Sequence, residues 1–201
     1  QYESFQANPI YLDSAFNLLK KTDSYFPCFV QYYYLKNDDK GLIHFAMNND
    51  VDTAKYNNTD LAITYSRMGE VYVRNNMSGT AEKYFAKATK LMPFVIDYKI
   101  KQGAFLIKQN RLAASKIVFT SALSLNPTIK EIHLNLGYIS LLERNFTKAD
   151  LYLKQALALD PDYVLAYENL VLSAQMQNKM EEAKVYLNKI LEIAPNHKAK
   201  T

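Results

Sequence analysis

The 201-residue sequence predicts an all-α fold, a solenoid of stacked helical pairs. Two observations predict it: a repeat of fixed period, and apolar residues at helical spacing within each repeat. Four of the six prolines stand 34 residues apart, and each ends a similar apolar phrase. These are Pro93, Pro127, Pro161 and Pro195. A fixed period of about 20–50 residues is typical of proteins whose units bury their apolar faces by stacking on one another.

The N-terminal residues 1–61 show helical spacing without a clear repeat. We expect helices over 10–21, 28–36 and 40–48, the last two separated by the polar residues 37–39. The Asn-rich stretch from Asp50 to Asp60 is expected to be a polar connection. The chain begins with Gln1, which favours a processed form or a piece of a longer protein.

From residue 62 the prolines define four units of 34 residues: 62–95, 96–129, 130–163 and 164–197. Each unit contains two stretches of helical periodicity. In the third, Leu134 and Leu141 mark one helix, and Ala149, Leu153 and Ala156 mark the other. The turns between the paired helices carry asparagine, which tolerates the left-handed backbone that ends a helix. These are Asn75-Asn76, Asn110, Asn145 and Asn178.

The repeat signature resembles the tetratricopeptide repeat (TPR). That family has large aromatic, Leu-Gly and Tyr positions in the first helix, and a small–aromatic–small pattern followed by Pro in the second. The first unit supplies this pattern with Tyr65, Met68-Gly69, Tyr72, Ala81, Phe85, Ala88 and Pro93. The second unit is the weakest match, with Lys99, Gln102-Gly103, Leu106, Ser115, Phe119, Ala122 and Pro127.

The resemblance implies a right-handed α-α superhelix. Residues 1–61 would then be degenerate TPR-like or capping helices, and 198–201 a truncated polar tail. Small residues at Gly69, Gly103 and Gly137 would let paired helices approach closely. Phe85 and Phe119 are expected to fill the seam to the next unit. An uncovered apolar face on the last helix, 180–193, would favour self-association through the array ends.

Composition and motifs argue against catalysis. The sequence is 49% hydrophobic and 22% charged, as expected of a folded chain, and its five glycines leave little material for phosphate-binding loops. Its single cysteine, Cys28, excludes an internal disulfide, and we expect a buried, inert thiol there. His44, His133 and His197 lack metal-ligand spacing, and His133 is expected to pack as the large residue of its repeat. We therefore expect no enzyme activity, cofactor or metal.

The charge and hydropathy of the sequence argue against a nucleic acid or a membrane as the binding partner. The net charge of +4 conceals a basic middle, residues 98–148, with eight basic and two acidic side chains. These charges are too dispersed for a nucleic-acid-binding stripe, and no run reaches the ~18 apolar residues that cross a membrane. We therefore expect neither nucleic-acid binding nor membrane insertion.

In TPR arrays the first helices line the concave face, and the resemblance implies a peptide-binding groove there. Its expected residues are Ser66, Glu70, Arg74, Lys101, Lys108, Asn135, Tyr138, Leu142, Asn169, Leu172 and Met176. The Lys, Asn, Asn, Lys, Arg clamp of chaperone-binding TPRs is not matched at the corresponding positions. An apolar or aromatic anchor flanked by acidic groups would suit this surface.

The sequence therefore predicts a non-catalytic scaffold that binds a peptide or helical segment of a protein partner. Two alternatives remain open: a structural spacer or self-assembly module of a larger protein, and a helical-repeat RNA binder. The RNA alternative is the less favoured, because the polar positions vary between units: Arg67, Lys101, Asn135 and Asn169.

Overall fold

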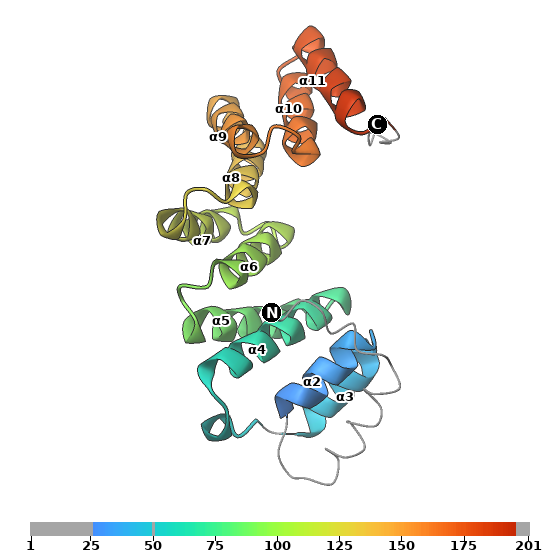
Figure 1. Cartoon of the computed structure of the whole chain (residues 1–201), viewed down its shortest axis with the longest axis vertical. Coiled ribbons are helices and arrows are strands. Elements are labelled where there is room, and N and C mark those ends of the chain that lie inside the picture. Colours follow the sequence, from blue (N-terminus) through green and yellow to red (C-terminus); the bar gives the residue numbers. More distant parts are fainter. Residues whose placement is uncertain (1–25, 50, 196–201) are drawn as a thin grey trace. The chain divides into compact units, whose positions relative to one another are not determined.

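The structure, a computed structural model, describes residues 26–49 and 51–195 (Figure 1). Within these residues the chain forms ten α-helices, one short 3₁₀ helix (η1) and no strands. Their bounds are α2 (Phe26–Leu35), α3 (Asp39–Asn48), η1 (Thr53–Lys55), α4 (Asn58–Arg74), α5 (Ser78–Leu91), α6 (Ile96–Lys108), α7 (Leu112–Leu125), α8 (Lys130–Leu142), α9 (Phe146–Leu159), α10 (Val164–Met176) and α11 (Met180–Ile193). The expected helix 10–21 and the tail 198–201 lie outside the described residues.

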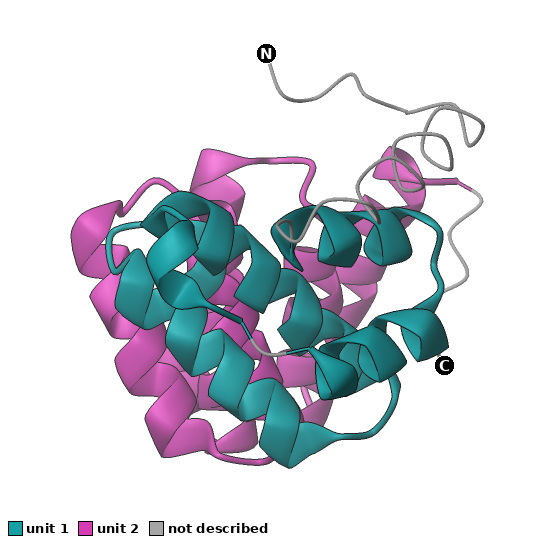
Figure 2. Ribbon diagram, turned by 90° about the horizontal axis from the view of Figure 1, so that it is seen from below, with its two compact units in different colours: residues 1–98 teal, residues 99–201 magenta. Residues whose placement is uncertain are grey.

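The helices belong to two compact units, residues 1–98 and 99–201, drawn in different colours in Figure 2. In the first unit α2 packs against α3, and both contact α4, which pairs with α5. In the second unit α8 pairs with α9 and α10 with α11, and α10 also contacts both α8 and α9. Within each unit, neighbouring helical pairs therefore contact one another, as stacked repeats require.

The turns between paired helices share a left-handed residue. Asn76, Asn110 and Asn178 have φ of 59°, 55° and 59°. In the third unit the prediction of Asn145 is wrong, since Arg144 holds this conformation with φ of 56°. The left-handed position keeps the 34-residue period, and Asn145 lies one residue beyond it. Asn145 instead caps α9, its side chain accepting a hydrogen bond from the backbone N–H of Lys148 at 3.2 Å.

The N-terminal helical pair, α2 and α3, also has a left-handed residue in its turn. The expected helices 28–36 and 40–48 correspond to α2 and α3, each of which begins and ends within two residues of the expected bounds. Between them Asn37 is left-handed, with φ of 53°. Asp38 then caps α3 by accepting a hydrogen bond from the N–H of Gly41 at 2.8 Å. The turn therefore has the chemistry of the later repeats.

The connection expected over 50–60 is shorter than predicted. Helix α4 begins at Asn58, so the last three residues of that segment belong to its first turn. The side chain of Asn57 accepts a hydrogen bond from the N–H of Asp60 at 2.8 Å and caps the helix. The asparagines that suggested a loop therefore include the residue that starts a helix.

Glycines allow close packing within the pairs. A Cβ added to Gly69 would lie 2.8 Å from the ring of Phe85, and one added to Gly103 would lie 2.5 Å from the ring of Phe119. The close approach is as predicted, but both phenylalanines fill the space over the glycine of their own unit. We had expected them at the seam to the next unit. In the second unit the Ser115 hydroxyl also donates to the Gly103 carbonyl at 2.8 Å.

The core of the second unit joins three helices. Leu141 of α8, Ala149 and Leu153 of α9, and Leu170 of α10 form one buried cluster. Tyr138 is among the half-buried side chains that pack against it. The first and second helices of one repeat and the first helix of the next thus share one core, which holds α8 and α10 in place relative to each other.

Candidate functional site

The residues with catalytic or metal-binding chemistry have structural surroundings. No three His, Cys, Asp or Glu side chains in residues 26–49 and 51–195 are grouped to hold a metal ion. His133 is buried, as expected, and its Nε2 donates to the Pro127 carbonyl at 2.7 Å. Cys28 is half-buried rather than buried, and partial burial, with the nearby Asp60 charge, raises the pKa of its thiol. The third histidine considered as a metal ligand, His197, lies outside the described residues.

None of the helices described here combines the length and the apolar character needed to cross a membrane.

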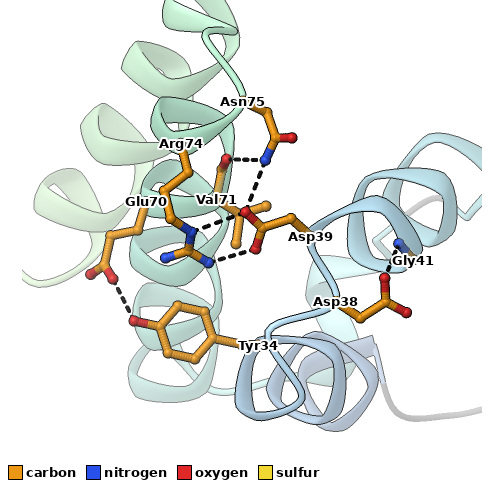
Figure 3. A network of polar contacts seen from close by, with 8 residues as sticks. All are labelled: Tyr34, Asp38, Asp39, Gly41, Glu70, Val71, Arg74 and Asn75. Atoms are coloured by element: carbon orange, nitrogen blue, oxygen red, sulfur yellow. Dashed lines mark hydrogen bonds and ion pairs between the residues drawn. The ribbon is translucent and has the colours of Figure 1, made fainter.

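Three expected groove residues of α4 are engaged within the first unit. Ser66 is only 2% exposed, and its Oγ has no hydrogen-bond partner among the described residues. A Glu70 carboxylate oxygen accepts a hydrogen bond from the Tyr34 hydroxyl at 2.5 Å. Arg74 donates two hydrogen bonds to Asp39, at 3.0 and 2.6 Å (Figure 3). Ser66 is therefore closed to a ligand, and Glu70 and Arg74 have partners within the first unit, although the Arg74 side chain is 44% exposed.

The same network ties α2 and α3 to α4. Asn75 adds a third hydrogen bond to Asp39 at 3.0 Å. The Asp39 carboxylate therefore accepts from two side chains, that of Arg74 in α4 and that of Asn75, the C-cap residue of α4. Hydrogen bonding to Arg74 lowers the pKa of Asp39. Burial, followed by the hydrogen bond to Glu70, raises the pKa of Tyr34. The guanidinium carbons of Arg67 and Arg74 each lie 5.5 Å from the Tyr34 ring centroid, within cation–π range.

Sequence reasoning missed Tyr34 and Asp39 as the partners of α4. One signal was present: Asn37 lies in the turn between α2, which carries Tyr34, and α3, which begins at Asp39, as Asn76 lies in the turn between α4 and α5. Recognising Asn37 as a repeat turn would have placed a helical pair next to α4, and with it partners for Glu70 and Arg74.

In the second unit three expected groove residues are exposed and apolar. We call Leu142, Leu172 and Met176 the α8–α10 patch; their side chains are 44%, 38% and 40% exposed. Leu142 ends α8, and the other two lie in the C-terminal half of α10, which contacts α8. Large apolar side chains with this exposure on adjacent helices are a recognised feature of binding surfaces.

The remaining expected groove residues of the second unit differ in exposure and in partners. Tyr138 is half-buried against the core. The side-chain amides of Asn135 and Asn169 donate to backbone carbonyls one turn earlier, at 2.7 and 3.0 Å. Lys101 is half-buried in α6, and Lys108 is exposed at the end of that helix. The structure therefore keeps Lys108 and the patch open to a ligand.

Comparison with known proteins agrees with the helical repeats. The family model described as tetratricopeptide repeat matches residues 130–163 and 165–197. The sequence matches no curated protein. Among solved structures, MamA from Desulfovibrio magneticus RS-1 is 16% identical with a TM-score of 0.62, and the match covers 94% of this chain and 96% of MamA.

Two further structures have the same fold. YrrB, described as a TPR protein with an unusual peptide-binding site, is 17% identical with a TM-score of 0.62 over 92% of this chain and 95% of YrrB. PilW, described as a widely conserved type IV pilus biogenesis factor, is 22% identical with a TM-score of 0.65 over 96% of this chain and 80% of PilW. These likenesses establish the fold expected from the repeat signature.

Proposed function

Because the chain carries tetratricopeptide repeats, we propose that it is a non-catalytic scaffold that binds a peptide or helical segment of a partner protein. The binding surface is the side of the first helices that carries the α8–α10 patch. One observation carries the proposal: three large apolar side chains stay exposed on two helices whose neighbouring residues form a well-packed core. A likeness in fold to YrrB, whose description includes a peptide-binding site, supports the same kind of function.

The patch has the physical properties of an anchor site. Burying apolar area stabilises a complex by about 25 cal/mol per Å², and a few central apolar contacts dominate most peptide interfaces. The helices that carry the patch are packed together by the core, so a ligand would meet a preorganised backbone. Lys108, exposed on the preceding first helix α6, favours acidic groups beside an apolar anchor in the ligand.

The proposed site is smaller than the groove expected from the sequence. It comprises Lys101, Lys108, Asn135, Tyr138, Asn169 and the α8–α10 patch. Ser66, Glu70 and Arg74 are left out because of their burial or their contacts within the first unit.

Peptide selection tests the proposal without knowledge of the partner. Phage-displayed peptides are selected on the wild-type protein, and the best are synthesised and measured by fluorescence anisotropy. The double variant Leu172→Ser/Met176→Ser removes two patch side chains that are already partly exposed, so it should fold normally. We expect it to weaken binding at least tenfold, since loss of each anchor costs on the order of 1 kcal/mol.

A matched control separates the patch from general hydrophobicity. Ile117→Ser/Val185→Ser removes two apolar side chains of the second helices α7 and α11, which are 72% and 60% exposed. This variant should bind the selected peptides like the wild type. Equal weakening in both variants, or none in the patch variant, would contradict the proposal.

A spacer or self-assembly role is the second candidate, because the last helix pair also exposes apolar residues. Met180 and Leu191 of α11 are both exposed. Light scattering over a wide concentration range distinguishes the two functions. A monomer at all concentrations favours the scaffold, whereas an association that Met180→Ser/Leu191→Ser abolishes favours assembly.

A further inference from the structure

Each unit has a shallow hollow on a second helix of a repeat. In the first unit a hollow of about 460 Å³ lies along α5 and is lined by Lys83, Lys87 and Lys90 beside Tyr84. In the second unit a hollow of about 450 Å³ lies along α9 and the turn after α10, with Lys148, Lys154 and Lys179 in its lining. Neither includes a residue of the proposed groove.

The two hollows occupy the same place in the repeat. Thr80 and Lys148, Lys83 and Leu151, and Ala86 and Lys154 all line them, and the members of each pair are two 34-residue periods apart. The second helix of a repeat is therefore hollowed at equivalent positions in both units, although the lysines that line the two hollows stand at different positions of the repeat.

The lysines of the hollow on α5 have no internal counter-charge. Lys83, Lys87 and Lys90 are all exposed, and none forms an ion pair with a described residue. The Lys87 ammonium lies 5.1 Å from the Tyr65 ring centroid and 5.4 Å from that of Tyr84, which holds it at the rim. Like charges one turn apart on a helix destabilise it, and an anionic ligand would relieve the repulsion.

The hollow on α9 also has more lysines than carboxylates in its lining. Lys148, Lys154 and Lys179 are exposed, and their ammonium groups make no ion pair within the described part of the chain. Its one carboxylate, Asp150, accepts a hydrogen bond from the Ser173 hydroxyl at 2.6 Å. The exposed Leu151 adds an apolar surface between the lysines.

We propose that each hollow binds an acidic peptide segment of a partner protein, with its carboxylates on the lysines and an apolar side chain against Tyr84 or Leu151. Stacking favours a peptide over a nucleic acid. The Tyr84 ring already stacks on Tyr72, at 5.4 Å and 6°, and Lys87 lies over it, so the part of the ring that lines the hollow suits a small apolar side chain better than a stacked base.

Stoichiometry tests the proposal independently of the groove. The probe is a synthetic eight-residue peptide of Asp and Glu with one central Leu, titrated by isothermal calorimetry at low salt. The wild type should bind two peptides. Lys83→Glu/Lys90→Glu and Lys148→Glu/Lys154→Glu should each bind one with unchanged affinity, and the quadruple variant should bind none.

Two comparisons make the test decisive. Lys40→Glu/Lys55→Glu changes the net charge equally at exposed lysines outside the hollows and should still bind two peptides. Equal loss in this control would show general electrostatic attraction and overturn the proposal. Tighter binding of an eight-nucleotide oligothymidine than of the peptide, lost in the same hollow variants, would also overturn it. Circular dichroism confirms the helix content of each variant.

Discussion

At the turns between paired helices, one left-handed residue sets the direction of the following helix. Three of the four repeats supply asparagine, whose side chain tolerates this conformation, and one supplies Arg144. Any Cβ there approaches the following carbonyl oxygen and strains the backbone, and the short polar side chain of asparagine offsets this cost by local hydrogen bonding, which arginine does less well. The left-handed geometry therefore recurs at the same position of each 34-residue repeat, whichever residue occupies it. The residue type changes only the free energy that the turn costs.

Replacement at this turn should stabilise the protein. We expect Arg144→Asn to raise the free energy of unfolding by about 0.5–1 kcal/mol, since it relieves left-handed strain. The reverse change, Asn178→Arg, should lower it by a similar amount. Urea denaturation followed by circular dichroism measures both, and an Arg144→Asn variant less stable than the wild type would contradict the explanation.

The ion pair of Asp39 and Arg74 predicts a pH dependence. The folded pKa of Asp39 lies below its ordinary value of 3.8, so its contribution is fully present above that pH and is lost as pH falls through the folded pKa. Asp39→Asn should cost up to about 1 kcal/mol at pH 7, a limit set by partial exposure and solvent screening. Unfolding in urea at pH 7 and pH 3 should show this difference shrinking.

Asp162→Asn serves as the control for that experiment. Asp162 is exposed, and no hydrogen bond or ion pair of its carboxylate is found among the described residues. Its replacement should change stability equally at both pH values. A pH-independent effect of Asp39→Asn would show that the carboxylate charge does not join α3 to α4.

At the scale of helices, contact between paired helices depends on glycines opposite large side chains. Gly103→Ala would place a Cβ 2.5 Å from the Phe119 ring, whose position is fully buried. We expect a loss of about 1–3 kcal/mol, because neither the ring nor the helix can move freely. Differential scanning calorimetry measures this change in the free energy of unfolding.

Gly79 provides the contrast for this packing effect. A Cβ at Gly79 in α5 would meet no atom within 4 Å. Gly79→Ala should therefore stabilise the protein by up to about 0.5–1 kcal/mol, because alanine restricts the unfolded chain and favours the helix. Destabilisation of the two variants by the same amount would contradict the role of close packing.

The sequence predicted helices better than their partners. The 34-residue period and the glycine–aromatic spacing indicated the paired helices from α4 onward, because both are local patterns. Phe85 and Phe119 were expected at a seam because spacing along a helix does not specify the surface that faces a side chain. Glu70 and Arg74 were expected in a groove because their partners, Tyr34 and Asp39, lie more than 30 residues earlier, in a part of the chain without the repeat signature.

At the scale of the whole molecule, the repeats offer two kinds of surface. The first helices α8 and α10 present the apolar α8–α10 patch, and Lys108 is exposed at the end of α6. The second helices α5 and α9 present lysine-lined hollows. These surfaces favour different ligands, an apolar anchor in one case and clustered carboxylates in the other, so a single scaffold could hold segments of both kinds.

Hydrogen–deuterium exchange with a bound selected peptide is the most direct test of the proposed scaffold function. We predict slower exchange in α8 and α10 when the peptide binds, and no such slowing in the Leu172→Ser/Met176→Ser variant at the same peptide concentration. Slower exchange confined to helices outside α6, α8 and α10, or unchanged by the double substitution, would contradict peptide binding at the first helices.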